Sequence, residues 1–399
     1  MMRRKIYGLI LVGMMLLMAG CSTDDVVKET TSERAIAISF SCNYDDPEEH
    51  PTRAGHEGVM NTEDLYATGF GVMASTTAGT VEPYDNKPNL MYNQEVEFTF
   101  VGDREELIDP EHTELGVKKG YWSYSPLKYW PTSLDHCYIS AYAPYQELPI
   151  ANPETTTGIY GLSTNSTAPY VDYRRCEKPG NVVDLLWYYE QPGSIPDAGI
   201  LNMKMRHALA RLEIKVALAS APASGTKVLI EKITLTGKMA KTGRLHLYEQ
   251  TTEGSGNDIK YYPVWSDQTY DLDHSIKIKN KDNDSESYGI IDAQVRYIEG
   301  MPYSWQPAGL STTLQNALST GDRTGYVYLI PQPSATPAEG DPTGLSLTVK
   351  VTCKKWVQGE EGQPTTYIKT TNVDVTPTAV ANPLKGNTTY TLNLTLSGI

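Results

Sequence analysis

Apolar residues recur at every second position in several short segments, whereas no segment keeps the 3.6-residue spacing of an amphipathic helix. Since successive side chains of a strand point to opposite faces of a sheet, this spacing predicts half-buried strands. The clearest runs are Ile36, Ile38, Phe40 and Cys42; Val96, Phe98 and Phe100; and residues 212–218 and 345–353. Further strand candidates, bounded by turn-forming residues, are 65–75, 138–143, 228–236, 326–330 and 367–375. A short helical piece is expected only near residues 310–318.

The composition agrees with an all-β fold. The 399 residues include 27 tyrosines but only 4 phenylalanines, and the 32 glycines and 25 prolines are spread along the chain as turn residues. A chain of this length is long enough for two or three domains with a sizeable core. Many short strands separated by turns predict β-sandwiches.

The first 21 residues have the layout of a lipoprotein export signal. Arg3, Arg4 and Lys5 precede an apolar run over residues 6–18, and small residues then lead to Cys21. The run is shorter than the about 20 apolar residues that span a bilayer. We therefore expect residues 1–20 to be removed and Cys21 to carry acyl chains such as palmitate. The alternative is a plain secretory signal that is cut nearby.

Charge and motifs argue against several functions. A net charge of −14 without a long basic patch makes nucleic acid and anionic lipid surfaces poor partners. The seven histidines form no ligand pair, and the chain has no nucleophile elbow and no phosphate-binding glycine loop. Asp282, Asp284 and Glu286 lack the glycine and the distal glutamate of a calcium loop, so a solvated hairpin tip is favoured. We expect no enzyme, no metal and no cofactor; a hydrolase with a site assembled from distant residues is the weakest alternative.

Four cysteines follow Cys21, namely Cys42, Cys137, Cys176 and Cys353. They are far apart and allow up to two disulfides in three pairings, among which the sequence does not choose. Because Cys42, Cys137 and Cys353 lie within apolar strand patterns, we expect mostly free, buried thiols.

The first predicted strand, residues 35–42, is followed by a polar stretch over residues 43–52 and then by Arg53 and Ala54. Such a loop should be exposed, which is what a trypsin-like protease needs to reach the bond after Arg53. Cutting there would free the first strand and leave an unpaired edge that another strand can fill. Arg34 is a rival site, but it precedes the strand, so cutting there would release the anchor without opening a groove.

The last strand pattern places Tyr390, Leu392, Leu394 and Leu396 on one face, alternating with polar residues. A strand this regular can pair with its own sheet or with a neighbour's. These four residues are therefore candidates for a donated strand.

The order of several motifs resembles the fimbrillin family, the lipoprotein precursors of type V pili in Gram-negative anaerobes. The residues that carry the resemblance are Cys21 with the acidic stretch 22–25, then 35–42, 52–54, 126–131, 138–145, 206–212, 328–332 and 390–399. They extend over nearly the whole mature chain.

The resemblance implies two transthyretin-like β-sandwich domains in tandem. Residues 1–20 would be the signal peptide and 21–53 a lipidated segment removed on maturation; residues 54–205 would form the N-terminal sandwich and 206–399 the C-terminal one. It also implies an outer membrane lipoprotein at the cell surface, cleaved after Arg53 and assembled with other fimbrial subunits by strand donation. A host protein or glycan would be its ligand, and a non-polymerising anchor or tip subunit is an alternative.

Aromatic residues suggest a second function, that of a monomeric surface glycan-binding lipoprotein. Aromatic clusters occur at residues 122–130, 187–189 and 261–265, and a sugar can stack on exposed flat rings. Tyrosine is also common in sheets, where its ring packs and its hydroxyl reaches water, and that interpretation is favoured for each cluster. The glycan hypothesis predicts loss of affinity when Trp187 or Trp265 is replaced by alanine.

Overall fold

The computed structural model describes residues 35–44, 60, 62–76, 87–101, 120–134, 137–176, 182–218, 226–279, 294–295, 326–332, 348–358, 364–365, 371–375 and 384–396. By their contacts, Ile36–Ile399 belong to one compact unit.

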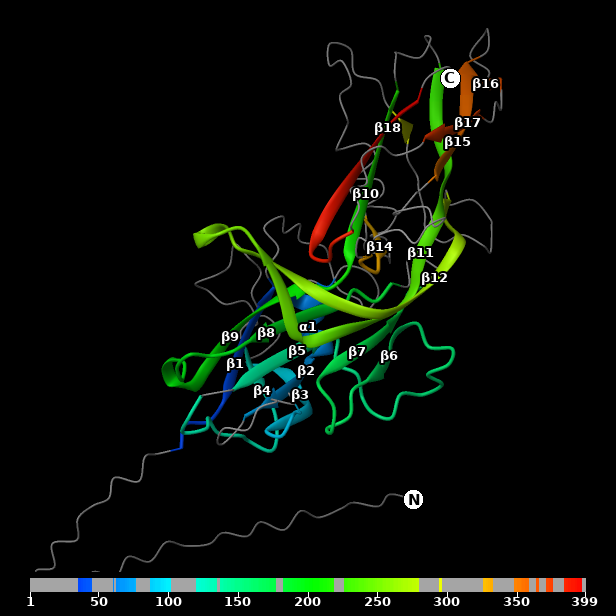
Figure 1. Ribbon diagram of the computed structural model, residues 1–399. Helices are drawn as coiled ribbons and strands as arrows, with labels where there is room; N and C mark the ends of the chain where they lie inside the picture. The colour runs from blue at the N-terminus through cyan, green and yellow to red at the C-terminus, as the bar shows by residue number, and fades with distance from the viewer. Residues whose placement is uncertain are drawn as a thin grey trace, which may run out of the picture. The chain divides into compact units, whose positions relative to one another are not determined.

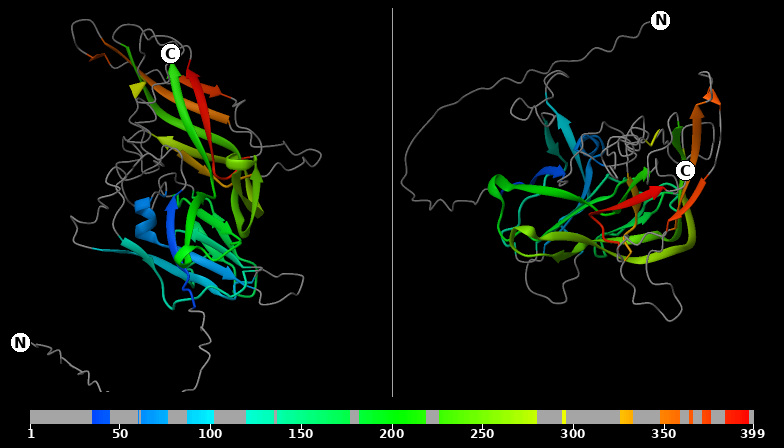
Figure 2. Two further views of the ribbon diagram at one scale, coloured as in Figure 1. Left: turned by 90° about the vertical axis from the view of Figure 1, so that its left-hand side faces the viewer. Right: turned by 90° about the horizontal axis from the view of Figure 1, so that it is seen from above.

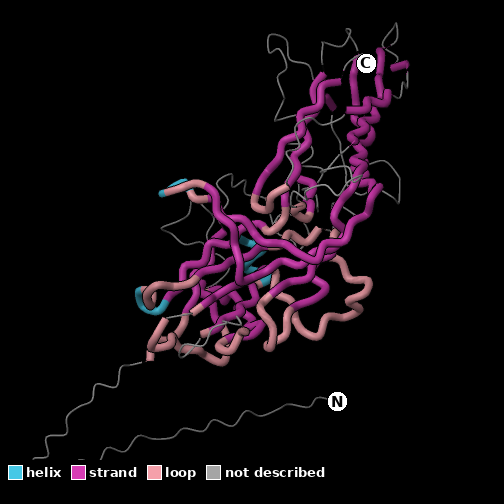
Figure 3. Tube along the Cα trace, viewed as in Figure 1, coloured by secondary structure: helices cyan, strands magenta, loops and turns pink. Residues whose placement is uncertain are grey.

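Strands dominate the described residues (Figure 3). The helical elements among them are α1 (Thr62–Thr68) and two 3-10 turns, η3 (Asp197–Gly199) and η4 (Gly256–Asp258). No helix in the described part of the chain is long and apolar enough to cross a membrane. The prediction of an all-β fold is confirmed.

Seven strands form the first sheet (Figure 1). In spatial order they are β1 (Ser39–Tyr44), β9 (Ile200–His207), β8 (Leu186–Glu190), β5 (Tyr138–Ala143), β2 (Phe70–Ser75), β3 (Met91–Phe100) and β4 (Gly120–Ser123). Neighbouring strands of this sheet are antiparallel, except that β1 runs parallel to β9.

A second sheet has three strands, with β10 (Ala210–Leu218) between β14 (Tyr326–Leu329) and β18 (Thr388–Leu396). Here too one pair is parallel, since β18 follows the direction of β10 along its whole length (Figure 2). The partners of the two parallel strands are consecutive in the sequence: β1 pairs with β9, and β18 pairs with β10.

The third sheet is built around the long strand β11 (Thr226–Glu253). Its other strands are β6 (Gly158–Leu162), β7 (Tyr170–Arg174), β12 (Lys260–Lys279), β13 (Gln294–Val295), β15 (Thr348–Gln358), β16 (Pro364–Thr365) and β17 (Thr371–Val375).

Strand β11 changes its partner along its length. Residues 226–236 pair with β15, and residues 242–246 pair with β7. Strand β12 pairs with β11 from Lys232 to Glu253. Irregularities between Gly237 and Met239 and between Ala240 and Thr242 bend the strand where the partner changes. Because β7 precedes residue 205 and β11 follows it, strand pairing crosses the expected domain boundary, and the division at 205/206 stays a prediction.

The alternation located most of the strands but was wrong at residues 65–75. Only Phe70–Ser75 is a strand, because α1 occupies Thr62–Thr68. The helix ends at Gly69, which has a φ of +65° and donates its N–H to the Leu65 carbonyl at 2.9 Å. Residues 310–318, 345–347 and 367–370 lie outside the described residues.

Cys42, Cys137 and Cys176 are buried and form no disulfide, as expected for these three cysteines. Burial raises the pKa of the Cys137 thiol to about 11 and that of Cys42 further. Both thiols therefore stay protonated and unreactive at neutral pH. The side chain of Cys353 lies outside the described residues.

A buried polar network fixes the corner between β9 and β10. The Asp184 carboxylate accepts hydrogen bonds from His207 Nδ1 at 3.0 Å and from the backbone N–H of Met60 at 3.0 Å. Nε2 of His207 lies 3.1 Å from Nη1 of Arg211, so the neutral ring donates to the carboxylate and accepts from the guanidinium. Burial, and then the charge of Arg211, hold the pKa of His207 well below its ordinary value.

We expect this network to make folding stability depend on pH. The folded protein keeps His207 neutral, whereas the unfolded chain protonates it below its ordinary pKa of 6.5. The unfolded state then binds more protons, so stability falls on acidification below pH 6.5, by up to about 1.4 kcal/mol per pH unit. Urea unfolding at pH 7.5 and 5.5 measures the effect, and His207→Gln should lose this part of the slope. Equal slopes in the two proteins would contradict the assignment.

Candidate functional site

The first strand is held by backbone hydrogen bonds on both of its edges. On one edge β1 pairs with β9, from Ser39 opposite Ile200 to Tyr44 opposite Met205. The other edge is engaged just before the strand begins. There the N–H of Ile38 donates to Lys128 O at 2.9 Å and the N–H of Trp130 donates to Ile36 O at 2.9 Å. Removing residues 36–44 would therefore leave the edge of β9, the carbonyl of Lys128 and the N–H of Trp130 without these partners.

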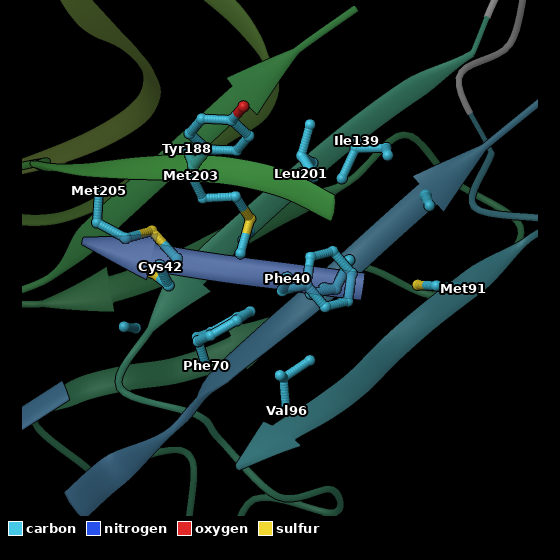
Figure 4. Packing of buried hydrophobic residues seen from close by; sticks show 14 of the residues in the cluster. Phe40, Cys42, Phe70, Met91, Val96, Ile139, Tyr188, Leu201, Met203 and Met205 are labelled. Carbon is cyan, nitrogen blue, oxygen red and sulfur yellow. The ribbon is translucent and has the colours of Figure 1, made fainter. Parts of the chain in front are cut away.

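We call the surroundings of this strand the β1 seat: strand β9, residues 124–130, and the core side chains beneath β1. The side chains of the first strand that point into the core are Ile38, Phe40 and Cys42, with exposed fractions of 0, 6 and 2 %. Figure 4 shows Phe40 and Cys42 within the core cluster that also contains Met203 and Met205 of β9. Ile36 is 42 % exposed, so the buried face of the strand begins at Ile38.

Tyr124 connects the first strand to residues 124–130. Its hydroxyl donates to Ile38 O at 2.8 Å and accepts from the N–H of Lys128 at 3.2 Å. Burial raises the pKa of the phenol, which keeps the proton that it donates. The same ring packs against Phe40, with centroids 5.5 Å apart.

Gly199 lets the turn before β9 approach the first strand. Its φ is +75°, and a Cβ there would collide with the Ala37 carbonyl oxygen. Nε1 of Trp130 donates to Gly199 O at 2.9 Å, so the turn is held from the opposite flank of the seat. Only glycine combines this conformation with this close approach.

All four phenylalanines of the chain belong to one set of aromatic contacts that starts in the seat. Phe40 meets Phe70 edge-on at 5.9 Å, and Trp122 lies 4.8 Å from Phe70 and 5.1 Å from Phe98. Phe98 lies 5.0 Å from Phe100, which is 41 % exposed. Loss of the first strand would remove the ring at the buried end of this set.

The candidate donor strand, β18, pairs in parallel with β10. Tyr390, Leu392, Leu394 and Leu396 lie opposite Leu212, Ile214, Val216 and Leu218 in the register. The Tyr390 hydroxyl accepts a hydrogen bond from the N–H of Lys385 at 2.9 Å.

Ala208 and Leu209 form the corner between β9, which pairs with β1, and β10, which pairs with β18. The N–H of Ala208 donates to Leu185 O at 2.7 Å, and Trp265 Nε1 donates to Ala208 O at 3.1 Å. The N–H of Asn387 donates to Leu209 O at 3.2 Å, directly before β18. The beginning of β18 is thus anchored at the end of β9.

Several predicted sites lie outside the described residues: Cys21, Arg34, Arg53, Ala54, and the acidic group Asp282, Asp284 and Glu286. Met60 is the first described residue after the expected cleavage loop, and Asp184 holds its N–H. Within the described ranges, no three His, Cys, Asp or Glu side chains form a group that could hold a metal ion.

The structure contradicts the assignment of Trp187 as a glycan-stacking residue, because its side chain is fully buried. Trp265 packs against the second core cluster and donates its N–H to Ala208 O. Sequence periodicity also missed Tyr124, Lys128 and Gly199, which contribute backbone or hydroxyl groups to the seat. The stretch 126–131 entered the sequence analysis only as part of the family resemblance, without a link to the first strand.

Comparison with known proteins gives a family and a set of distant folds. A family model described as fimbrillin-like matches residues 52–398. The chain is similar to a solved fimbrial protein from Bacteroides vulgatus, with 18 % identity over 90 % of this chain and 95 % of that chain and a TM-score of 0.48. It is also similar to a "putative cell adhesion protein" from Bacteroides uniformis, with 12 % identity over 91 % and 94 % of the two chains and a TM-score of 0.40. No curated protein gives a significant sequence match.

We expect Gly199→Ala to loosen the first strand. The added methyl group strains the backbone at positive φ and pushes against Ala37, so hydrogen-exchange protection of residues 36–44 should fall by about tenfold. Gly193→Ala is the matched control, because no atom lies within 4 Å of the added Cβ there. Equal protection of the first strand in both variants would contradict the role of Gly199.

Proposed function

The chain belongs to the fimbrillin-like family, and on this premise we propose that it is a structural or adhesive subunit of cell-surface fimbriae. Other fimbrial subunits are its partners, and it performs no catalysis. The geometry of the β1 seat is the observation that supports this proposal most directly.

The proposed maturation step is cleavage after Arg53, between Arg53 and Ala54. The first strand is joined to the rest of the described protein through residues 45–59, which contain this arginine. A cut there leaves the first strand bound non-covalently, by its hydrogen bonds to β9, Tyr124 and residues 128–130 and by the burial of Ile38, Phe40 and Cys42. Non-covalent strands can be exchanged, and an emptied seat offers main-chain hydrogen bonds and apolar pockets to a replacement.

The proposed donor strand toward a neighbouring subunit is β18, with Tyr390, Leu392, Leu394 and Leu396 as its apolar face. Its parallel pairing with β10 supports this proposal, because β1 also runs parallel to its partner β9. A donated strand of the same polarity can therefore replace β1 without reversing the direction of the chain.

We further propose that the protein is exported as a lipoprotein with Cys21 as the lipidated residue, and that it reaches the outer membrane. Residues 54–205 and 206–399 would form two transthyretin-like sandwiches, which share the long strand β11 through its pairing with β7. The arginine-directed cut removes residues 21–53 together with the anchor. A subunit that remains uncut would stay on the membrane as an anchor.

Strand exchange after cleavage tests this function. Trypsin should cut a protein comprising residues 22–399 after Arg53, and the cut protein should then take up a labelled peptide with the sequence of residues 35–44, as measured by intact mass. The uncut protein should take up no peptide, because its own strand remains covalently attached at high effective concentration.

Arg53→Ala is expected to block cleavage and uptake, whereas Arg34→Ala should leave both unchanged. Cleavage at Arg53 without any uptake of peptide would refute strand exchange at the β1 seat. Uptake by the uncut protein would show that cleavage does not control access.

A further inference from the structure

The β1 seat has three inward positions of unequal size. The position of Phe40 is large and aromatic, since the ring lies 5.9 Å from Phe70 and 5.5 Å from Tyr124 and is almost fully buried. A smaller side chain there would leave a void beside these rings, and voids in a packed core are unfavourable.

The position of Cys42 is small. Cys42 is 2 % exposed, lies opposite Met203 in the register and belongs to a cluster with Met205 and Tyr188. Protein interiors are close-packed, so a larger side chain at this position must displace its neighbours. The seat therefore requires an aliphatic residue, then an aromatic residue, then a small apolar residue, each separated by one outward residue.

The last strand of this chain does not meet that requirement in any register. Its aromatic residue, Tyr390, is followed at the next inward position by Leu392, which is too large for the Cys42 position. Placing Leu392 or Leu394 at the Phe40 position leaves a void and again puts leucine at the Cys42 position. Placing Leu396 there brings Gly398 to the Cys42 position but still leaves the void.

A shift by one residue is worse, because Thr391, Asn393 and Thr395 would then point into the core. In the register with β10, the three leucines lie opposite Ile214, Val216 and Leu218.

Resting on the proposed function, we infer that the β1 seat is selective for the strand of a different subunit, with the pattern aliphatic–x–aromatic–x–small, over the last strand of a second copy of this chain. The seat excludes self-donation through the aromatic position of Phe40 and the small position of Cys42. In a solution that contains only the cut protein, the last strand of one copy should consequently not fill the β1 seat of another copy.

Competition between peptides tests this inference. The protein cut after Arg53 is incubated with a labelled peptide of residues 35–44, and unlabelled competitors displace it. The peptide of residues 388–399 should compete at least about tenfold less well than the unlabelled peptide of residues 35–44. In the latter, Phe40→Leu and Cys42→Leu should each weaken binding by about tenfold, because one opens a void and the other overfills the core.

Ser41→Leu is the matched control, since it adds a larger side chain on the outward face and should change binding less than threefold. In the peptide of residues 388–399, Leu392→Ala should tighten binding although it removes apolar surface, whereas Leu394→Ala should not. Equal competition by the two wild-type peptides, or no effect of Cys42→Leu, would overturn the selectivity. If the labelled peptide of residues 35–44 itself fails to bind, the proposed strand exchange fails instead.

Discussion

Pairing of the first strand on both edges is the constraint on which the rest of the β1 seat depends. A strand at the edge of a sheet needs partners on one side only, but the segment leading into β1 also bonds to Lys128 and Trp130. The hydroxyl of Tyr124 donates to Ile38 O, and the indole N–H of Trp130 donates to Gly199 O. Residues 124–130 are therefore bonded both to the segment that leads into β1 and to the turn before β9.

Core packing converts this arrangement into a chemical pattern. Ile38, Phe40 and Cys42 differ in size, and all three are buried in one core cluster. Hydrogen bonds to the backbone are indifferent to sequence, so they would accept any strand of the right polarity. Discrimination among strands must therefore come from the fit of side chains. The side chains of Phe40 and Cys42 determine which strand binds, whereas the backbone hydrogen bonds do not.

Sequence periodicity could predict elements whose two faces differ in burial. It located the inward face of β1, because buried and partly exposed side chains alternate from Ile38 to Cys42. Strands β5 and β14 are buried on both faces, and short apolar runs bounded by turn residues located them. Periodicity failed at α1, where a seven-residue helix is too short for a helical period to be distinguished from a strand and Gly69 stops it directly before β2. The parallel direction of β1 and the change of partner along β11 depend on residues far apart in the chain, which no local pattern contains. Lys128 and Gly199 each accept a hydrogen bond at the backbone carbonyl, so a pattern of side chains in the sequence does not predict these contacts.

The parallel pairing of β18 with β10 also has a mechanical consequence. When a strand is pulled along its own axis against a neighbour, all of the bonds between the two resist sliding at once; when it is peeled from one end, they break one after another. The register from Ala210 and Thr388 to Leu218 and Leu396 extends over the full length of both strands. A lengthwise pull on the end of the chain therefore meets the whole ladder in shear, and a sideways pull meets it one pair at a time.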